Sequence, residues 1–378
     1  MRAKAALRQP GFSLIEMLVV IGIIGILAAI SLGGLTRNRG ESLEGVSTLI
    51  SNVIRQARHT AMSTGAPVEI RVHGDDQQGY RISGVTQFMI YGQQFDNAES
   101  LSRDFGIDDP ATLPLGFAGY GLPLDEPLTW TAPRVRPELL RHENDSFYLE
   151  LTYRPPAQAE SWELSLVALA IDGQVLVDCW LQSPAAIGEP WTIAVGNPEQ
   201  PENDLIVQRH LPINRFTTFG ILYRRGQIRL SIDGAHGQWV PHPTQPGEYL
   251  FESWEQDYQL PLSPPFGQPV SLIFGGQESP PEAEEGEDED TPPPQRGTID
   301  NVRLMRLGAG DDVLLPWDVA PASEYSLLIH PDGRVEAEPD TWTMRYAGSG
   351  RPLYREAIIV LDNNGRLTMT LVGSSEED

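Results

Sequence analysis

The sequence predicts an α+β protein in which one long N-terminal helix packs on a small antiparallel sheet, with an all-β sandwich inserted between the strands of that sheet. Three observations support this prediction. An apolar run over residues 12–35 continues into an amphipathic helical repeat that ends near Ser63. After it, short segments of alternating apolar and polar residues are separated by turn residues. The chain contains 36 Gly and 32 Pro, the residue types that favour such turns. Two smaller groups of such segments flank a longer series between residues 92 and 318.

The N-terminus begins with a basic leader, residues 1–11, which contains Arg2, Lys4 and Arg8 and no acidic residue. The apolar run that follows has one charge, Glu16, and at about 1.5 Å per helical residue it is long enough to cross a bilayer. Because basic flanks stay on the cytoplasmic side, the C-terminal region is predicted to lie on the extracytoplasmic side of the membrane.

Two ordinary kinds of N-terminal segment are alternatives. A secretory signal peptide has a shorter apolar region with a small-x-small cleavage site, and residues 28–31 could mimic such a site. A plain membrane anchor would not be expected to hold a carboxylate near the start of its apolar run. Because an acidic side chain inside a membrane is costly, the presence of Glu16 suggests that this residue has a functional role.

Residues 11–17, Gly-Phe-Ser-Leu-Ile-Glu-Met, resemble the cleavage and methylation motif of type IV pilins and type II secretion pseudopilins. The resemblance implies that a prepilin peptidase cuts after Gly11 and methylates the new amine of Phe12. It also implies that Glu16 has a role in assembly, paired with the N-terminal ammonium of a neighbouring subunit. Such a pairing would make a buried carboxylate tolerable and would set the register between subunits.

The helical pattern continues past the membrane segment. Apolar residues recur at steps of three and four, at Leu43, Val46, Leu49, Ile50, Val53, Ile54, Ala57 and Ala61. Thr64-Gly65 is predicted to end this helix, and Pro67 follows it. One helix, half in lipid and half on a sheet, is similar to the stalk of a pilin.

The strands around the central region resemble a pilin body that is split in two. Residues 66–72 and 79–83 predict a hairpin and, with the preceding helix, resemble the GspH/FimT group of minor pseudopilins. The strands that would complete this body lie near the C-terminus, at 325–333, 341–346, 357–361 and 366–372, with Asn364-Gly365 as a hairpin turn. The predicted units are the leader (1–11), the transmembrane part of the helix (12–35), the rest of the helix with the first strands (36–91), the inserted sandwich (92–318) and the completing strands (319–373).

The central region has the even spacing of short strands that is typical of a β-sandwich. Three pieces, 228–234, 272–276 and 297–304, resemble in their order a concanavalin A-like or laminin-G-like jelly roll. Residues 278–295 are rich in Glu, Asp and Pro and are predicted to form a disordered acidic loop.

Composition narrows the function. The net charge of −25 argues against a nucleic-acid partner, because a phosphate backbone is bound by clustered Lys and Arg. Cys179 is the only cysteine, so no intramolecular disulfide can form, and we expect it to be buried. No catalytic pair is identified: Glu150 and Glu163 are expected to face solvent, and Asp204 lacks the following acid of one glucanase pattern.

No metal ligand or cofactor site is identified either. Calcium stays an alternative that the laminin-G-like resemblance raises, but no set of spaced ligands supports it. The candidate ligand-binding residues are aromatic rings that could stack on a sugar, although a core position is the favoured interpretation for each. They are Trp180, Trp191, Trp239 and Trp254.

These observations predict a non-enzymatic minor pseudopilin or pilin-like subunit of a type II secretion or type IV pilus-like system. The expected partners are a prepilin peptidase, other pilin or pseudopilin subunits, the bacterial inner membrane, and a glycan or secreted protein. A pilus-anchored carbohydrate-binding adhesin is one alternative, and a membrane-tethered glycan hydrolase ranks last. A major pilin is not expected, because a bulky insertion would crowd a close-packed shaft.

Overall fold

The computed structural model describes residues 41–373, except 76, 96–97, 108, 110–112, 117–118, 125, 133–144, 157–161, 187, 246, 261–268, 277–295, 349–353 and 363–365. The leader, the apolar run with Phe12 and Glu16, and the acidic loop 278–295 lie outside the described residues. Within the described part of the chain, no helix has the length and apolar character needed to span a membrane.

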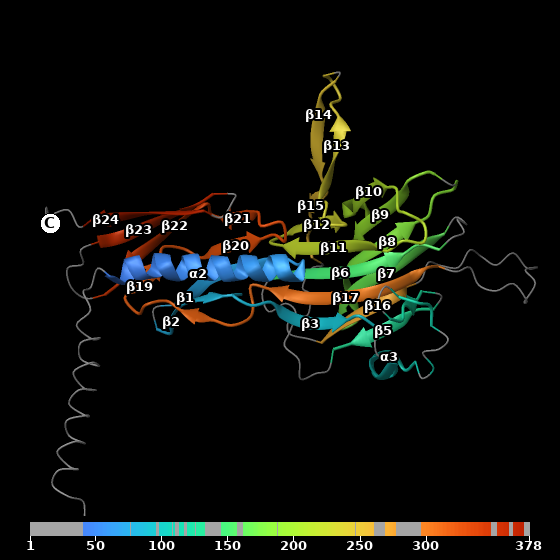
Figure 1. Ribbon diagram of the computed structural model, residues 1–378, viewed down its shortest axis with the longest axis horizontal. Coiled ribbons are helices and arrows are strands. Elements are labelled where there is room, and N and C mark those ends of the chain that lie inside the picture. The colour runs from blue at the N-terminus through green and yellow to red at the C-terminus, as the bar shows by residue number, and fades with distance from the viewer. Residues whose placement is uncertain are drawn as a thin grey trace, which may run out of the picture.

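Two packed bodies lie next to each other along the long axis of the molecule (Figure 1). One, which we call the α2 body, has a hydrophobic core built from residues 41–85 and 313–373. The other, which we call the sandwich, has a separate core built from residues 88–307. The chain therefore leaves the α2 body, forms the sandwich, and returns to finish the body in which it began.

Helix α2 (Glu41–Thr64) covers the core of the α2 body with one apolar stripe. The stripe follows the predicted helical spacing, because residues three and four apart lie on the same face. Its members, each at most 5% exposed, are Leu43, Val46, Ile50, Val53, Ile54, Ala57 and Ala61. Gly65 ends the helix in the left-handed region at φ 68°, and its N–H donates to the carbonyl of Ala61 at 2.9 Å. The predicted helix end is thus confirmed.

Two antiparallel sheets complete the α2 body. The first has the order β18-β2-β1-β20-β21, and the second β19-β22-β23-β24. The strands of the first are β1 (Val68–Asp75), β2 (Gly79–Ser83), β18 (Val313–Leu314), β20 (Tyr325–Ile329) and β21 (Val335–Glu338). Those of the second are β19 (Val319–Pro321), β22 (Thr341–Tyr346), β23 (Tyr354–Leu361) and β24 (Leu367–Gly373).

Strand β1 pairs with strands from both parts of the chain that form the α2 body. It pairs with β2 on one side, as the predicted hairpin requires, and with β20 on the other, where Val68 lies opposite Ile329. The expectation of one small sheet needs correction, because β22, β23 and β24 pair with one another and not with β20 or β21. The two sheets face a shared core, in which Trp342 of β22 stacks on Tyr325 of β20.

The sandwich consists of two antiparallel sheets. The seven-stranded sheet has the order β15-β12-β11-β6-β17-β3, with β4 also paired to β17, and the six-stranded sheet has the order β10-β9-β8-β7-β16-β5. The first contains β3 (Phe88–Gln93), β4 (Leu122–Pro123), β6 (Ser146–Arg154), β11 (Thr217–Arg224), β12 (Gln227–Ile232), β15 (Glu255–Asp257) and β17 (Thr298–Leu307). The second contains β5 (Leu128–Thr131), β7 (Glu163–Ile171), β8 (Gln174–Gln182), β9 (Trp191–Gly196), β10 (Leu205–Arg209) and β16 (Val270–Gly276).

The sandwich extends slightly differently from the expected range 92–318. Strand β3 begins at Phe88 and pairs with β17 of the sandwich, whereas β18 at 313–314 pairs with β2 of the α2 body. A short helix, α3 (Ala98–Phe105), packs beside β5 through the buried Leu101. By strand pairing the sandwich runs from Phe88 to Leu307, so both ends lie nearer the N-terminus than expected, the second by more than the first.

One element stands apart from both bodies. Strands β13 (Gly237–Pro241) and β14 (Tyr249–Ser253) form a two-stranded sheet of their own. Figure 1 shows this hairpin projecting away from the rest of the molecule near the place where the two bodies meet.

Candidate functional site

The two bodies are joined through a buried carboxylate, Glu69 of β1. Its side chain is 1% exposed and accepts hydrogen bonds from Arg71 at 3.0 Å, from Ser326 at 2.7 Å, and from Arg224 of the sandwich at 3.3 Å. Burial alone would raise the pKa of Glu69, but the guanidiniums of Arg71 and Arg224 hold it below its usual value. Glu69 therefore stays ionised and ties a strand of each body together.

Further ion pairs cross the same boundary. Asp145, 3% exposed, lies between Arg71 of β1 at 3.1 Å and Arg306 of β17 at 2.9 Å. Arg303 of β17 donates to the carbonyl of Thr64 at the end of α2, 2.6 Å away. A cation is favourable there because the C-terminal end of a helix has a partial negative charge. The sandwich thus holds the end of α2.

Glu150 is the partner of this arginine. It accepts from Nε of Arg303 at 2.9 Å and from the hydroxyl of Tyr148 at 3.0 Å, and it is 4% exposed. The expectation that Glu150 faces solvent was wrong, because the outer face of β6 is covered by the α2 body. Glu163 is only half-buried and accepts from Gln182 at 2.8 Å.

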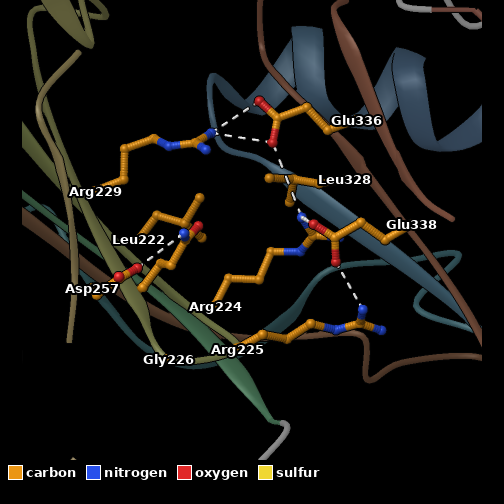
Figure 2. Close-up of a pocket in the computed structure, with 10 residues that line it drawn as sticks. Leu222, Arg224, Arg225, Gly226, Arg229, Asp257, Leu328, Glu336 and Glu338 are labelled. Atoms are coloured by element: carbon orange, nitrogen blue, oxygen red, sulfur yellow. Dashed lines mark hydrogen bonds and ion pairs between the residues drawn. The ribbon is translucent and has the colours of Figure 1, made fainter. Parts of the chain in front are cut away.

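A polar cavity of about 290 Å³ opens at this boundary (Figure 2). Arg224, Arg225 and Arg229 enter it from the sandwich, and Glu336 and Glu338 from β21 of the α2 body. The guanidiniums lie 2.7–3.3 Å from carboxylates or hydroxyls of the opposite body, as in Arg225–Glu338 at 2.7 Å and Arg229–Glu336 at 2.9 Å. Because the protein supplies these counter-charges itself, the geometry suits a fixed contact between the two bodies better than a site for a charged ligand. We call this contact, with its ion pairs, the joint.

Apolar side chains from both bodies pack behind these ion pairs. Ala66 and Leu328 of the α2 body meet Tyr148, Leu222, Met305 and Leu307 of the sandwich, and all six are at most 7% exposed. Burial of apolar surface stabilises the contact between the two bodies, and the hydrogen-bonded ion pairs fix their relative orientation. We therefore expect the sandwich to keep a constant orientation relative to α2.

The structure separates the four candidate tryptophans. Trp191 and Trp254 are 5% and 2% exposed and belong to the sandwich core, where Trp191 packs edge-on against Trp162. Trp180 is half-buried on β8. Trp239 is 68% exposed on the projecting hairpin. Nothing brings the four together, and Trp239 alone among them presents most of its surface to solvent.

The six-stranded sheet contains an unusual pair of neighbours, Asp178 and Cys179. Cys179 is fully buried, as expected, and burial raises the pKa of its thiol, which therefore stays protonated. Burial and the nearby Asp204 also raise the pKa of Asp178 to about 6, although Ser165 donates to it at 2.6 Å. Among the described residues, no group of three or more His, Cys, Asp or Glu is arranged to hold a metal ion.

Replacing Asp178 by asparagine should stabilise the protein at alkaline pH. The folded pKa of about 6 lies above the usual 3.8, so folding favours the protonated form and loses stability as the pH rises through 6. Asparagine keeps the oxygen that Ser165 contacts without the charge. We expect a gain of about 1–3 kcal/mol in the free energy of unfolding at pH 8 and little gain at pH 4.

Urea denaturation of the full chain in detergent at both pH values measures this effect. Asp172→Asn is the matched control, because Asp172 is exposed in the turn that joins β7 to β8 and adopts φ 51°, which asparagine tolerates. A gain of the same size at pH 4 and pH 8 would contradict an electrostatic cause.

Comparison with known proteins adds a finding at the N-terminus. Residues 7–32 match the prokaryotic N-terminal methylation motif. A search of curated proteins found no match.

Among solved structures, the chain is similar to an alginate lyase from Pseudomonas aeruginosa, with 16% identity, a TM-score of 0.32, and coverage of 58% of this chain and 96% of that one. It is also similar to domain 4 of a GH43 extracellular arabinanase from Geobacillus stearothermophilus in complex with arabinotriose, with 13% identity, a TM-score of 0.32, and coverage of 59% and 95%. A heptameric SAP-like pentraxin from Limulus polyphemus shows 8% identity, a TM-score of 0.27, and coverage of 51% and 73%. Similarity this low identifies neither a ligand nor an activity for this chain.

Proposed function

We propose that this chain is a minor pilin-like or pseudopilin subunit that assembles through its N-terminal helix and displays the sandwich as a recognition domain. The main support is the N-terminal methylation motif at residues 7–32, which contains Gly11, Phe12 and Glu16. This motif implies processing by a prepilin peptidase and partners of the pilin type. The motif alone does not select between a type II secretion system and a type IV pilus.

The α2 body supports the same proposal. Its helix α2, described from Glu41 to Thr64, packs on strands from both ends of the described chain. We infer that this is a pilin-like body of the GspH/FimT kind, split by the inserted sandwich. In this proposal residues 12–35 cross the inner membrane once, and both bodies lie on its outer side.

A binding role suits the sandwich better than catalysis. Glu150, one of the strand carboxylates considered above, is engaged by Arg303 and Tyr148 inside the joint. The joint would hold the sandwich at a constant angle to the helix, which is useful for a domain displayed on a fibre. We propose no cofactor.

Replacing Glu16 by alanine should leave cleavage intact and abolish incorporation into filaments. The carboxylate would no longer pair with the terminal ammonium of a neighbouring subunit, and an unpaired charge within packed apolar helices is costly. The measurement is mass analysis of the N-terminus of protein recovered from host membranes, together with the amount of protein in sheared filaments.

Glu44→Ala is the matched control, because Glu44 is an exposed carboxylate on α2 and its loss should change neither readout. In the unaltered chain we expect a mature N-terminus at methylated Phe12. A chain that is uncut, or cut near Ala29, would mean an ordinary anchor or signal peptide, and the proposal would then be wrong.

A further inference from the structure

The projecting hairpin exposes an unusual amount of apolar surface. Trp239 is 68% exposed, Tyr249 64%, Leu250 51% and Phe251 45%. Figure 1 shows that β13 and β14 extend away from both bodies, in agreement with the exposure of these side chains. Exposed apolar clusters on a folded surface commonly mark a contact site.

Strand register gathers the aromatic rings on one face of the hairpin. Trp239 lies opposite Phe251, and Pro241 lies opposite Tyr249. Because side chains alternate between the faces of a strand, these four share one side, which we call the aromatic face. Gln238 and Glu252, also paired, lie on the other side, with 3.3 Å between their side-chain amide and carboxylate.

The rings on this face are held in a defined arrangement. The planes of Trp239 and Phe251 meet at 65°, with their centroids 5.3 Å apart. The ring of Phe251 lies against Gly237, where an added Cβ would come within 2.4 Å of the backbone carbonyl oxygen of Glu252 and within 2.6 Å of a ring carbon of Phe251. The absence of a side chain at Gly237 therefore allows the Phe251 ring to pack against strand β13 and against the ring of Trp239.

We propose that the aromatic face binds an uncharged sugar chain by stacking. An exposed ring fits the C–H face of a sugar, and the indole N–H of Trp239 and the hydroxyl of Tyr249 can hydrogen-bond sugar hydroxyls. This inference rests on the proposed function and names the ligand class and the element of the displayed domain that recognises it.

The size of the face favours a small ligand. With about 200 Å² for each aromatic side chain, the exposed fractions of Trp239, Tyr249 and Phe251 leave roughly 350 Å² open to contact. A stable protein interface needs about 800 Å² on each partner. The aromatic face is therefore too small for a second copy of this chain to dock stably on it, but large enough for a few sugar rings.

Charge argues against negatively charged ligands. Residues 237–253 contain Glu248 and Glu252 and no Lys or Arg, and the whole chain has a net charge of −25. Like charges would repel an anionic bilayer, an acidic polysaccharide and another copy of the chain. An uncharged glycan meets no such repulsion.

The test is calorimetric binding by the full chain in detergent, with cellohexaose, maltohexaose and chitohexaose as uncharged probes and hexagalacturonate as an acidic one. We expect binding of at least one uncharged probe and at least a tenfold rise in Kd for Trp239→Ala. Gly237→Ala should also raise Kd, because it keeps every ring but its Cβ would displace both the backbone of Glu252 and the ring of Phe251. Trp317→Ala is the matched control, since Trp317 is 83% exposed on the α2 body, and it should bind as the unaltered chain does.

Failure of all uncharged probes to bind would overturn the inference, as would equal binding by Trp239→Ala or tighter binding of hexagalacturonate. Loss of self-association in Trp239→Ala would also overturn it, in favour of a contact between copies. Tyr249→Ala serves as a second variant if Trp239→Ala does not fold. Trp239→Ala should still be cut before Phe12, so loss of sugar binding with normal processing would test the hairpin alone. If the unaltered chain were not processed, the proposed function would be wrong instead.

Discussion

Replacing Glu69 by alanine should lower the free energy of unfolding by about 3–5 kcal/mol, because removing one partner from a buried ion pair leaves the other charge without compensation. Arg71 would keep Asp145, and Arg224 would keep Glu338, but the latter carboxylate is about half-exposed and compensates poorly. Ser326 would lose its acceptor at 2.7 Å. The loss should loosen the contact between the two bodies as well as the strand that bears Glu69.

The same residue makes the joint sensitive to acid. The folded pKa of Glu69 lies below the usual 4.5, so its ionised form stabilises the fold at neutral pH, and this contribution is lost as the pH falls below 4.5. Glu336 acts in the same direction: burial would raise its pKa, but His330 and Arg229 lower it to about 2. Acidification should therefore weaken the contact between the two bodies at two carboxylates of the α2 body.

Urea denaturation of the full chain in detergent at pH 7 measures the effect of Glu69→Ala. Glu356→Ala is the control, because Glu356 pairs with Arg345 at 3.0 Å on an exposed surface, where such a pair contributes less than about 1 kcal/mol. Glu69→Gln keeps the shape without the charge and should fall between them. If Glu69→Ala behaved like Glu356→Ala, the carboxylate would not be holding the joint.

The helix and the paired strands of the α2 body could be predicted because their signals are local. The three- and four-residue repeat gives the buried stripe of α2, and Thr64-Gly65 marks its end through the freedom of glycine at positive φ. The strands on either side of Asn364-Gly365 pair as expected, with Leu361 opposite Leu367. Each of these features depends on neighbours in the sequence.

The joint could not be predicted, because it depends on contacts between distant segments. Glu69 and Glu150 each lie between apolar residues of a strand, where alternation indicates a side chain that faces solvent, and Arg224 lies at the end of its strand. In the folded chain that second face is covered by the other body. Glu69 pairs with Arg224 across the boundary, and Glu150 pairs with Arg303 of the neighbouring strand beneath it. The one sequence signal for this contact was the presence of charged residues on the same face of several strands.

Trp239 shows the same limit. In sequence it resembles Trp191, since both lie in short strands near turn residues, and a core position was favoured for each. Burial was decided by strand pairing: β9 lies inside the six-stranded sheet, whereas β13 pairs with β14 alone. Local pattern gives the strand, but the partner of the strand decides whether its side chains are buried.

Replacing Trp342 by alanine should also cost about 3–5 kcal/mol, because it removes the largest fully buried side chain of the α2 body. Trp342 is 1% exposed and stacks on Tyr325, with ring centroids 5.2 Å apart, between the two sheets that α2 covers. If the N-terminal helix and the C-terminal strands form one unit, the cavity should destabilise both together. Amide exchange should then rise in α2, although that helix is far from residue 342 in the sequence, while strands of the sandwich core such as β7 keep their protection.

Hydrogen exchange with mass spectrometry on the full chain in detergent distinguishes this from a local effect. Trp317→Ala removes a tryptophan that is 83% exposed on the same body and should leave both stability and exchange unchanged. Faster exchange confined to β22 and β23 would mean that the C-terminal strands are a unit of their own, and the inference of a split body would fail. Equal acceleration in α2 and in β7 would mean instead that the joint makes the two bodies unfold as one, because the buried pair between Glu69 and Arg224 couples them.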